Sequence, residues 1–165
     1  MIIEKIYTGE MMRSIGFRVS PKVVYFAICD KSDTEINILT IDCIKVPLSF
    51  SMPDALSFIR TTILSIVMEF NIGVAGIRTI EDNAQKISIS RVYIEGVIQE
   101  LISNCSIKRY FAGKKHTIAR LMGIPLQDLS KKLEGKEDIF GVEGWVDFLS
   151  EERESIFCAI AAFSL

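Results

Sequence analysis

The spacing of apolar residues changes near residue 50, and this change constrains the fold more than any other feature. Before it, apolar and polar side chains alternate, as at Ile15, Phe17 and Val19 in RSIGFRVSPKVVYFAICD, where SPK reverses the chain. A second alternating run covers residues 35–46, after the turn-forming DKSDT. Three successive strands with short connections predict an antiparallel meander.

From residue 51 onward the apolar residues follow helical spacing, and helical segments then alternate with short apolar runs. SMPDALSFIRTTILSIVMEFN predicts a helix with Ser51 as its N-cap and Asn71 at its end. The later segments predict a buried strand over residues 72–80, a long helix over about 83–103 and a strand over 105–111. They then predict short helices over 113–123 and 125–135, a loop over 136–145 and a final helix over 147–165. Because parallel strands need crossover helices, this order predicts an α/β fold with a mixed sheet and helices on both faces.

Length and composition favour one globular domain. With 165 residues and 49% apolar composition, residues 12–165 are expected to form a single core, and residues 1–11 an N-terminal extension. A formal net charge of -2 gives no global basic field, so any nucleic-acid contact would need a local basic patch.

Cysteine usage and hydropathy indicate a cytoplasmic protein. The cysteines lie far apart, and the single histidine, His116, completes no zinc-ligand spacing, so free thiols in a reducing cytoplasm are expected at Cys29, Cys43, Cys105 and Cys158. The sequence has no apolar run of the roughly 18 residues that a membrane span needs, and no signal peptide or membrane partner is expected.

The order of elements over residues 12–165 resembles that of the ribonuclease-H-like superfamily, most closely its RuvC-type Holliday-junction resolvases. The resemblance is carried by four segments, RSIGFRVSPKVVYFAICD, FNIGVAGIRTIEDNAQKISISRVYIEGVIQELI, SIKRYFAGKKHTIARLMG and SEERESIFCAIAAFSL. It implies a five-stranded mixed sheet in which the first three strands are antiparallel and the fourth and fifth run parallel to the first, with helices on both faces.

The resemblance also implies a nuclease centre, and here the sequence departs from the family. Such enzymes hold two divalent metals with about four carboxylates from the first strand, the fourth strand and the last helix. The first-strand aspartate falls on Arg18 in IGFR, and the fourth-strand glutamate falls on Arg78 in GIR. Only the last helix keeps acids, Glu151, Glu152 and Glu154. Because a guanidinium repels Mg²⁺, we expect no metal site and no cofactor on this register.

Two interpretations of Arg18 and Arg78 remain open. The guanidinium fork suits a phosphate or a partner's carboxylate, so both residues are candidate nucleic-acid ligands. Alternatively, both pair internally with the acids of the last helix. Displaced carboxylates, Glu81 and Asp82 above all, with Asp30 and Asp42, could restore a Mg-dependent site, although a pair such as Glu81 and Asp82 more often opens the helix that follows it.

A basic segment forms the second candidate site. It starts on a strand that we expect to be central and continues into the next helix, with Lys108, Arg109, Lys114, Lys115 and Arg120 as candidate nucleic-acid ligands. Tyr110 and Phe111 add aromatic surfaces on which bases could stack. The alternative is a solvated helix face with the aromatic residues in the core, and His116 has no assignable partner as a general base.

Three functional hypotheses follow. The first is a ribonuclease-H-like protein without nuclease activity that binds DNA or RNA or serves as an assembly subunit. The second is an active Mg- or Mn-dependent endonuclease that uses displaced carboxylates. The third is a dimeric protein-interaction module without a nucleic-acid ligand, in which the long helix from Asn83 packs against a second copy. Trp145 is either an anchor over the core or an interface residue.

Overall fold

The computed structural model describes residues 11–33, 35–138 and 140–165. The predicted N-terminal extension, residues 1–11, lies outside the described residues except for Met11. The first strand begins at the next residue, Met12.

The strands form one sheet in the order β3-β2-β1-β4-β5. Their bounds are Met12–Ser20 for β1, Val23–Lys31 for β2, Ile36–Lys45 for β3, Val74–Arg78 for β4 and Arg109–Gly113 for β5. Strand β2 is antiparallel to both β1 and β3, whereas β4 is parallel to both β1 and β5. The predicted meander and the predicted direction of the fourth and fifth strands are therefore confirmed.

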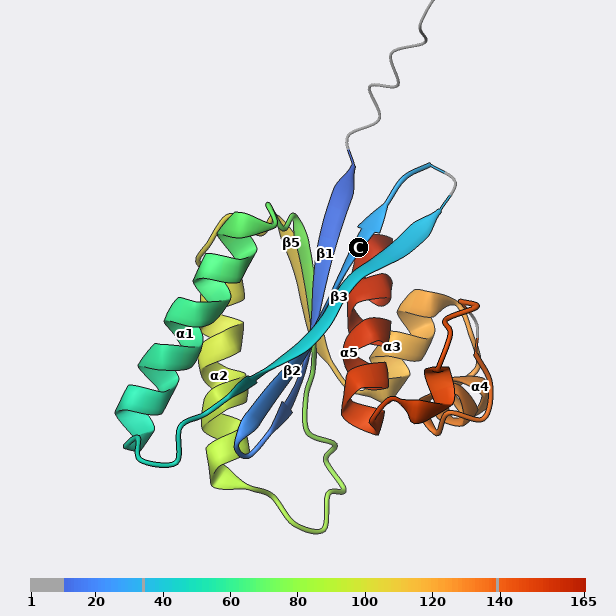
Figure 1. Cartoon of the computed structure of the whole chain (residues 1–165). Coiled ribbons are helices and arrows are strands. Elements are labelled where there is room, and N and C mark those ends of the chain that lie inside the picture. The colour runs from blue at the N-terminus through green and yellow to red at the C-terminus, as the bar shows by residue number, and fades with distance from the viewer. Residues whose placement is uncertain (1–10, 34, 139) are drawn as a thin grey trace, which may run out of the picture.

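Helices cover both faces of the sheet, as predicted (Figure 1). Their bounds are Met52–Glu69 for α1, Ile89–Ser103 for α2, Lys115–Met122 for α3, Leu126–Leu133 for α4 and Ser150–Ala161 for α5, with 3₁₀ turns Trp145–Asp147 (η1) and Ala162–Ser164 (η2). Helices α1 and α2 lie on one face, and α3, α4 and α5 lie on the other. Among the described helices, none is both long and apolar enough to cross a bilayer.

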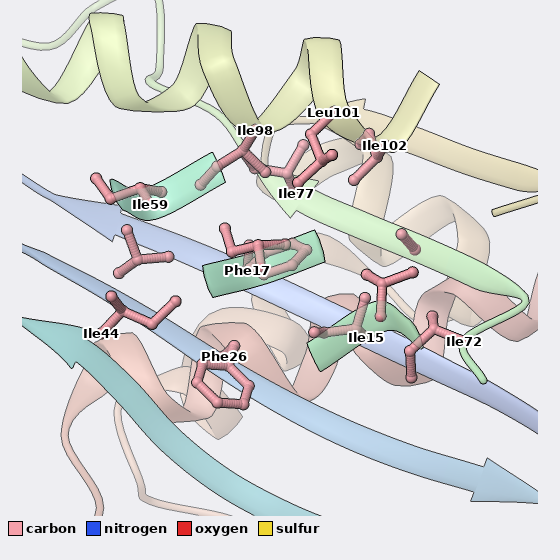
Figure 2. Close-up of a cluster of buried hydrophobic side chains, with 14 of the residues drawn as sticks. Ile15, Phe17, Phe26, Ile44, Ile59, Ile72, Ile77, Ile98, Leu101 and Ile102 are labelled. Atoms are coloured by element: carbon pink, nitrogen blue, oxygen red, sulfur yellow. The ribbon is translucent and has the colours of Figure 1, made fainter. Parts of the chain in front are cut away.

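The face beneath α1 and α2 is a core made mostly of aliphatic side chains (Figure 2). Ile15 and Phe17 of β1 point into it and are fully buried, as the alternation in RSIGFRV predicts. Ile59 from α1 and Ile98 from α2 close over them. Phase along β1 therefore puts Gly16 and Arg18 on the opposite face, beneath α5.

The opposite face is built around α5, which the sheet backbone approaches closely. A Cβ on Gly16 would lie 2.0 Å from the Ser155 carbonyl oxygen, and one on Gly76 would lie 2.6 Å from the Cys158 carbonyl oxygen. Glycine is therefore required at both positions for this packing. Trp145 is an anchor over this core, because it is 4% exposed and stacks edge-on against the Phe157 ring.

Three predicted segments need correction. Helix α2 begins at Ile89 and not near Asn83, because Ser88 is its N-cap and accepts the Arg91 N–H at 3.4 Å. The final helix is shorter than residues 147–165 and begins at Ser150, where Glu152 accepts the Leu149 N–H at 2.8 Å.

Strand β5 spans Arg109–Gly113 and not residues 105–111, and it is an edge strand, not a central one. The shift arises because Arg109 takes its register from Val74 of β4. The apolar residue Ile107 belongs to the preceding connection and packs into the core beneath α1 and α2.

Candidate functional site

The parallel register of β1 and β4 sets Arg18 directly beside Arg78. Both residues end the short stretch in which the two strands pair, and each lies two positions after a glycine that α5 covers, Gly16 or Gly76. Because side chains two positions apart share a face, both guanidiniums point toward α5.

A single carboxylate from α5 meets both arginines. Glu154 Oε2 lies 2.5 Å from Arg18 Nε and 3.2 Å from Arg78 Nε. The Glu154 and Arg78 side chains are only 9% and 6% exposed, and the Arg18 side chain is 14% exposed. In addition, each arginine donates from Nη1 to a backbone carbonyl next in sequence, Arg18 to Val19 and Arg78 to Thr79. The observed contacts of Arg18 and Arg78 are therefore those of internal ion-pair partners, the second of the two interpretations.

The glycines explain why this carboxylate reaches the strands. With no Cβ at Gly16 or Gly76, the backbone of α5 packs directly on the sheet at Ser155 and Cys158. Glu154 is thereby held within ion-pair distance of both strands. Burial of this kind is tolerated only because the opposite charges meet and the guanidiniums are also hydrogen-bonded.

The loop acids Glu81 and Asp82 contact cations on neighbouring elements and do not open α2. Glu81 Oε1 lies 3.0 Å from Arg78 Nη2 and accepts the Lys115 backbone N–H at 3.1 Å, at the first residue of α3. Asp82 pairs with the Lys114 ammonium. The expectation that these acids cap the next helix in sequence was wrong, because Glu81 serves the start of α3 instead.

The other candidate acids stand apart from Glu154. Glu151 accepts a hydrogen bond from Ser150, and Glu152 from the Leu149 N–H, so both belong to the start of α5. Burial, followed by the Glu151 charge, raises the pKa of Tyr25, the β2 residue paired with Arg18.

Asp30 and Asp42 do not join this group either. Asp30 lies opposite Arg13 in the β1–β2 register, near the other end of β1, and its carboxylate accepts a hydrogen bond from Asn37. Asp42 accepts the N–H of its own neighbour Cys43. Within residues 11–33, 35–138 and 140–165, no three carboxylate, histidine or cysteine side chains form a group suited to a metal ion. The residues at this site therefore do not fit a two-metal centre.

A third arginine, Arg91 on α2, joins the site and was missed from the sequence. Its Nε lies 2.7 Å from Glu95 Oε1, and Glu95, itself 5% exposed, also accepts the Ile80 N–H at 3.2 Å. Burial lowers the pKa of Arg91, and the nearby charge of Arg18 lowers it further. The signal that could have revealed it is the i, i+4 spacing of Arg91 and Glu95.

The predicted basic segment is divided between the two ends of the sheet. Gly113 pairs with Arg78, so Lys114 and Lys115 lie at the same end as the arginine pair. Lys108 and Arg109 lie at the opposite end, where they line a pocket of about 280 Å³ together with Arg13.

The remaining residues of the segment differ in exposure. Arg120 and His116 are exposed on α3, and neither belongs to the arginine site. Tyr110 is 46% exposed, whereas Phe111 is buried beneath α5. The segment therefore does not form one continuous patch, because β5 separates its two halves, and each of the two alternatives for the aromatic residues describes one of them.

Comparison with known proteins shows the fold. No protein-family model matches the chain, and no curated protein matches it. Two solved structures of Thermus thermophilus RuvC are similar, one described as in complex with Holliday junction substrate. That complex shares 10% identity with a TM-score of 0.69, over 93% of this chain and 94% of RuvC. The second shares 11% identity with a TM-score of 0.68 over the same fractions. The chain thus has the predicted ribonuclease-H-like fold.

Proposed function

We propose that this protein binds nucleic acid on a ribonuclease-H-like scaffold and does not carry out metal-dependent phosphodiester hydrolysis. The observation that carries the proposal is the pairing of Arg18 and Arg78 in register, with Glu154 neutralised between them. A divalent cation needs carboxylate or other oxygen ligands that are not already engaged with another positive charge. At this site the buried carboxylate is already shared by two guanidiniums, whose charge opposes cation binding.

Binding is supported by the basic residues at the same end of the sheet. Lys114 and Lys115 follow β5 there, and the pocket beside Arg18 adds Lys86 and Arg91. These residues gather four cations at one end of the sheet in a chain whose formal net charge is -2. Because the similar RuvC structure holds a Holliday junction, branched DNA is the first ligand to test.

The test is fluorescence anisotropy with a labelled four-way DNA junction, single-stranded DNA and single-stranded RNA. We expect binding that weakens with salt, with a slope of about -0.7 to -0.9 per neutralised phosphate. Lys114→Ala/Lys115→Ala should weaken binding about tenfold or more. Lys108→Ala/Arg109→Ala is the matched pair from the other end of the sheet and should change binding much less. No binding at low salt would refute the proposal.

The nuclease alternative is tested with the same oligonucleotides. Cleavage in Mg²⁺ or Mn²⁺ that is abolished by Glu81→Ala or Glu152→Ala would support an active centre of displaced carboxylates. We expect no cleavage, because Glu81 is engaged with Arg78 and Lys115, and Glu152 with the first turn of α5.

A second candidate function is self-association through α2. Ile89, Val92 and Tyr93 are 67%, 44% and 52% exposed on one side of this helix, next to Gly96, whose Cβ position is open. Exposed apolar groups at this spacing favour contact with another helix. Light scattering would detect a dimer, and Tyr93→Lys should dissociate it. A dimer without any nucleic-acid affinity would favour the interaction module.

The proposed place of action is a reducing compartment such as the cytoplasm. All four cysteines are free, and Cys29 and Cys158 are buried. Such thiols behave as small apolar groups in a core and need no oxidising environment.

A further inference from the structure

A pocket of about 250 Å³ opens beside Arg18, between the β1–β2 turn and the loop that joins β4 to α2. Its polar lining comes from Arg18 and Ser20 of β1, from Lys86 and Ser88 of the loop, and from Arg91 of α2. Every charged residue in its lining is a cation. We call these five residues the Arg18 pocket.

Two nearby acids pair with the arginines of this pocket from outside its lining, and Lys86 adds a cation that no acid in the described part of the chain neutralises. Glu154 approaches Arg18 from α5, and Glu95 engages Arg91 through Nε. Glu81 is held by Arg78 and by the N–H of Lys115. None of these three acids lines the pocket. Lys86 is exposed and forms no ion pair with any residue in the described ranges.

The two guanidiniums in the lining repel each other and leave a donor unused. Burial and the charge of Arg18 together lower the pKa of Arg91. Among the described residues, Arg91 Nη2 is buried and has no hydrogen-bond acceptor. A buried donor without a partner is costly, and an oxyanion in the pocket would relieve the repulsion between the two guanidiniums.

The start of α2 adds to the positive potential. Ser88, the N-cap of this helix, lines the pocket, and the helix runs for 15 residues from Ile89. The positive end of its dipole therefore lies at the pocket, where it favours an anion.

We propose that the Arg18 pocket binds one phosphate group of a nucleic acid, with Arg18, Lys86 and Arg91 supplying the charge and the Ser20 and Ser88 hydroxyls donating hydrogen bonds. This inference rests on the proposed nucleic-acid binding and assigns it a specific contact. The phosphate can be an internal phosphodiester or a terminal phosphomonoester, because both present non-bridging oxyanions on tetrahedral phosphorus, and inorganic phosphate presents the same kind of group as a probe.

The cleanest test changes Lys86, which has no ion pair to lose. Binding of a labelled single-stranded 12-mer is measured for the wild type, Lys86→Gln, Lys86→Arg and the control Lys31→Gln. Lys31 is an exposed lysine of β2 that lies opposite Met12 in the strand register, at the other end of β1. We expect Lys86→Gln to weaken binding about tenfold and to lower the salt slope by about one unit, as for the loss of one phosphate contact. Lys86→Arg should retain binding, and Lys31→Gln should match the wild type.

The source of the phosphate is identified by the 5′ end of the oligonucleotide. If the effect of Lys86→Gln is confined to a 12-mer carrying a 5′-phosphate, the pocket holds a terminal phosphomonoester. If the effect is equal for 5′-phosphate and 5′-hydroxyl 12-mers, it holds an internal phosphodiester.

Failure of the pocket and failure of the proposed function give different results. If the wild type binds DNA or RNA and Lys86→Gln behaves like Lys31→Gln, the pocket assignment is overturned while nucleic-acid binding stands. If no oligonucleotide binds, the proposed function fails. A titration with inorganic phosphate, followed by NMR, then shows whether the pocket binds a phosphate group. Saturable amide NMR shifts at Lys86 and Ser88, lost in Lys86→Gln, would then support a phosphate site. Unchanged spectra would overturn it.

Discussion

The helices on the two faces of the sheet pack against it through different kinds of contact. Beneath α1 and α2, long aliphatic side chains such as Ile15, Ile59 and Ile98 fill the space between helix and strand. Beneath α5, glycines let the backbones of helix and sheet meet. Whole side chains separate α1 and α2 from the strands on the first face. On the second face, α5 leaves no room for even one methyl group at Gly16.

This difference explains where the charged cluster can exist. A helix held away by isoleucine side chains could not bring one carboxylate within 3.2 Å of arginines on two adjacent strands, as Glu154 is. The close approach of α5 makes the shared contact short and buries most of the three side chains. The candidate site is therefore a consequence of the glycine-lined face.

Removing the shared carboxylate is the largest perturbation we predict. Glu154→Ala leaves two largely buried guanidiniums without their counter-charge, and we expect it to lower the free energy of unfolding by about 3–5 kcal/mol. Urea denaturation followed by the fluorescence of Trp145, the single tryptophan, would measure this. The control Glu151→Ala, at the start of the same helix, should cost at most about 1 kcal/mol. Equal effects of the two variants would contradict a shared buried ion pair.

Replacing all three residues of the ion-pair cluster, Arg18, Arg78 and Glu154, tests the same buried interaction in a second way. Arg18→Met/Arg78→Met/Glu154→Leu removes charge and counter-charge together, so we expect unfolding free energy close to that of the wild type or above it. The same variant should bind nucleic acid more weakly, because Arg18 lines the proposed phosphate pocket. A triple variant less stable than Glu154→Ala would show that the cluster itself stabilises the fold.

Adding one methyl group tests the contact of α5 with the sheet. In Gly16→Ala the new Cβ would lie 2.0 Å from the Ser155 carbonyl oxygen and 2.2 Å from the Ala159 nitrogen. Because both are backbone atoms, the helix must move, and we expect a loss of about 2–3 kcal/mol. Gly96→Ala, on the open side of α2, should instead stabilise by up to about 1 kcal/mol. Similar unfolding midpoints for the two variants would refute the comparison.

The aliphatic face should tolerate a change of the same size. Ile98→Val deletes one methylene from a fully buried side chain in the core beneath α1 and α2. We expect a loss of only about 1 kcal/mol by urea denaturation, because neighbouring side chains can relax into the space. A loss as large as that of Gly16→Ala would mean that both faces are equally rigid.

Thiol reactivity gives the smallest effect and compares the faces without mutation. Burial raises the pKa of Cys29 to about 12, and burial also raises the pKa of Cys158. Both thiols line the core beneath α5 and should stay protonated and unreactive toward Ellman's reagent at pH 8 in the folded protein. Cys43 and Cys105 are only partly buried and should react first. Rapid reaction of all four thiols would show that α5 does not seal its face.

Much of the fold followed from local patterns that the structure confirms. Alternation in RSIGFRV assigned Ile15 and Phe17 to one face and Arg18 to the other, and Ser51 caps α1 as predicted, accepting the Asp54 N–H at 3.4 Å. Patterns were weaker where tertiary contacts set the bounds. The start of α2 was misplaced because Glu81 and Asp82 pair with cations outside that helix. The span of β5 was misplaced because Ile107 packs into the core from the connection before the strand.

Residue patterns alone were enough to establish the order of strands and helices, the side of β1 on which Arg18 lies, and the absence of carboxylates at the two strand positions compared with the resolvases. These depend on periodicity and residue identity, which are local. The folded chain was needed to reveal that Arg18 and Arg78 share Glu154, that Arg91 lies beside Arg18, and that the basic segment is split between two ends of the sheet. Those facts depend on strand register and on how closely α5 approaches two glycines, and both are set by packing between segments far apart in the chain.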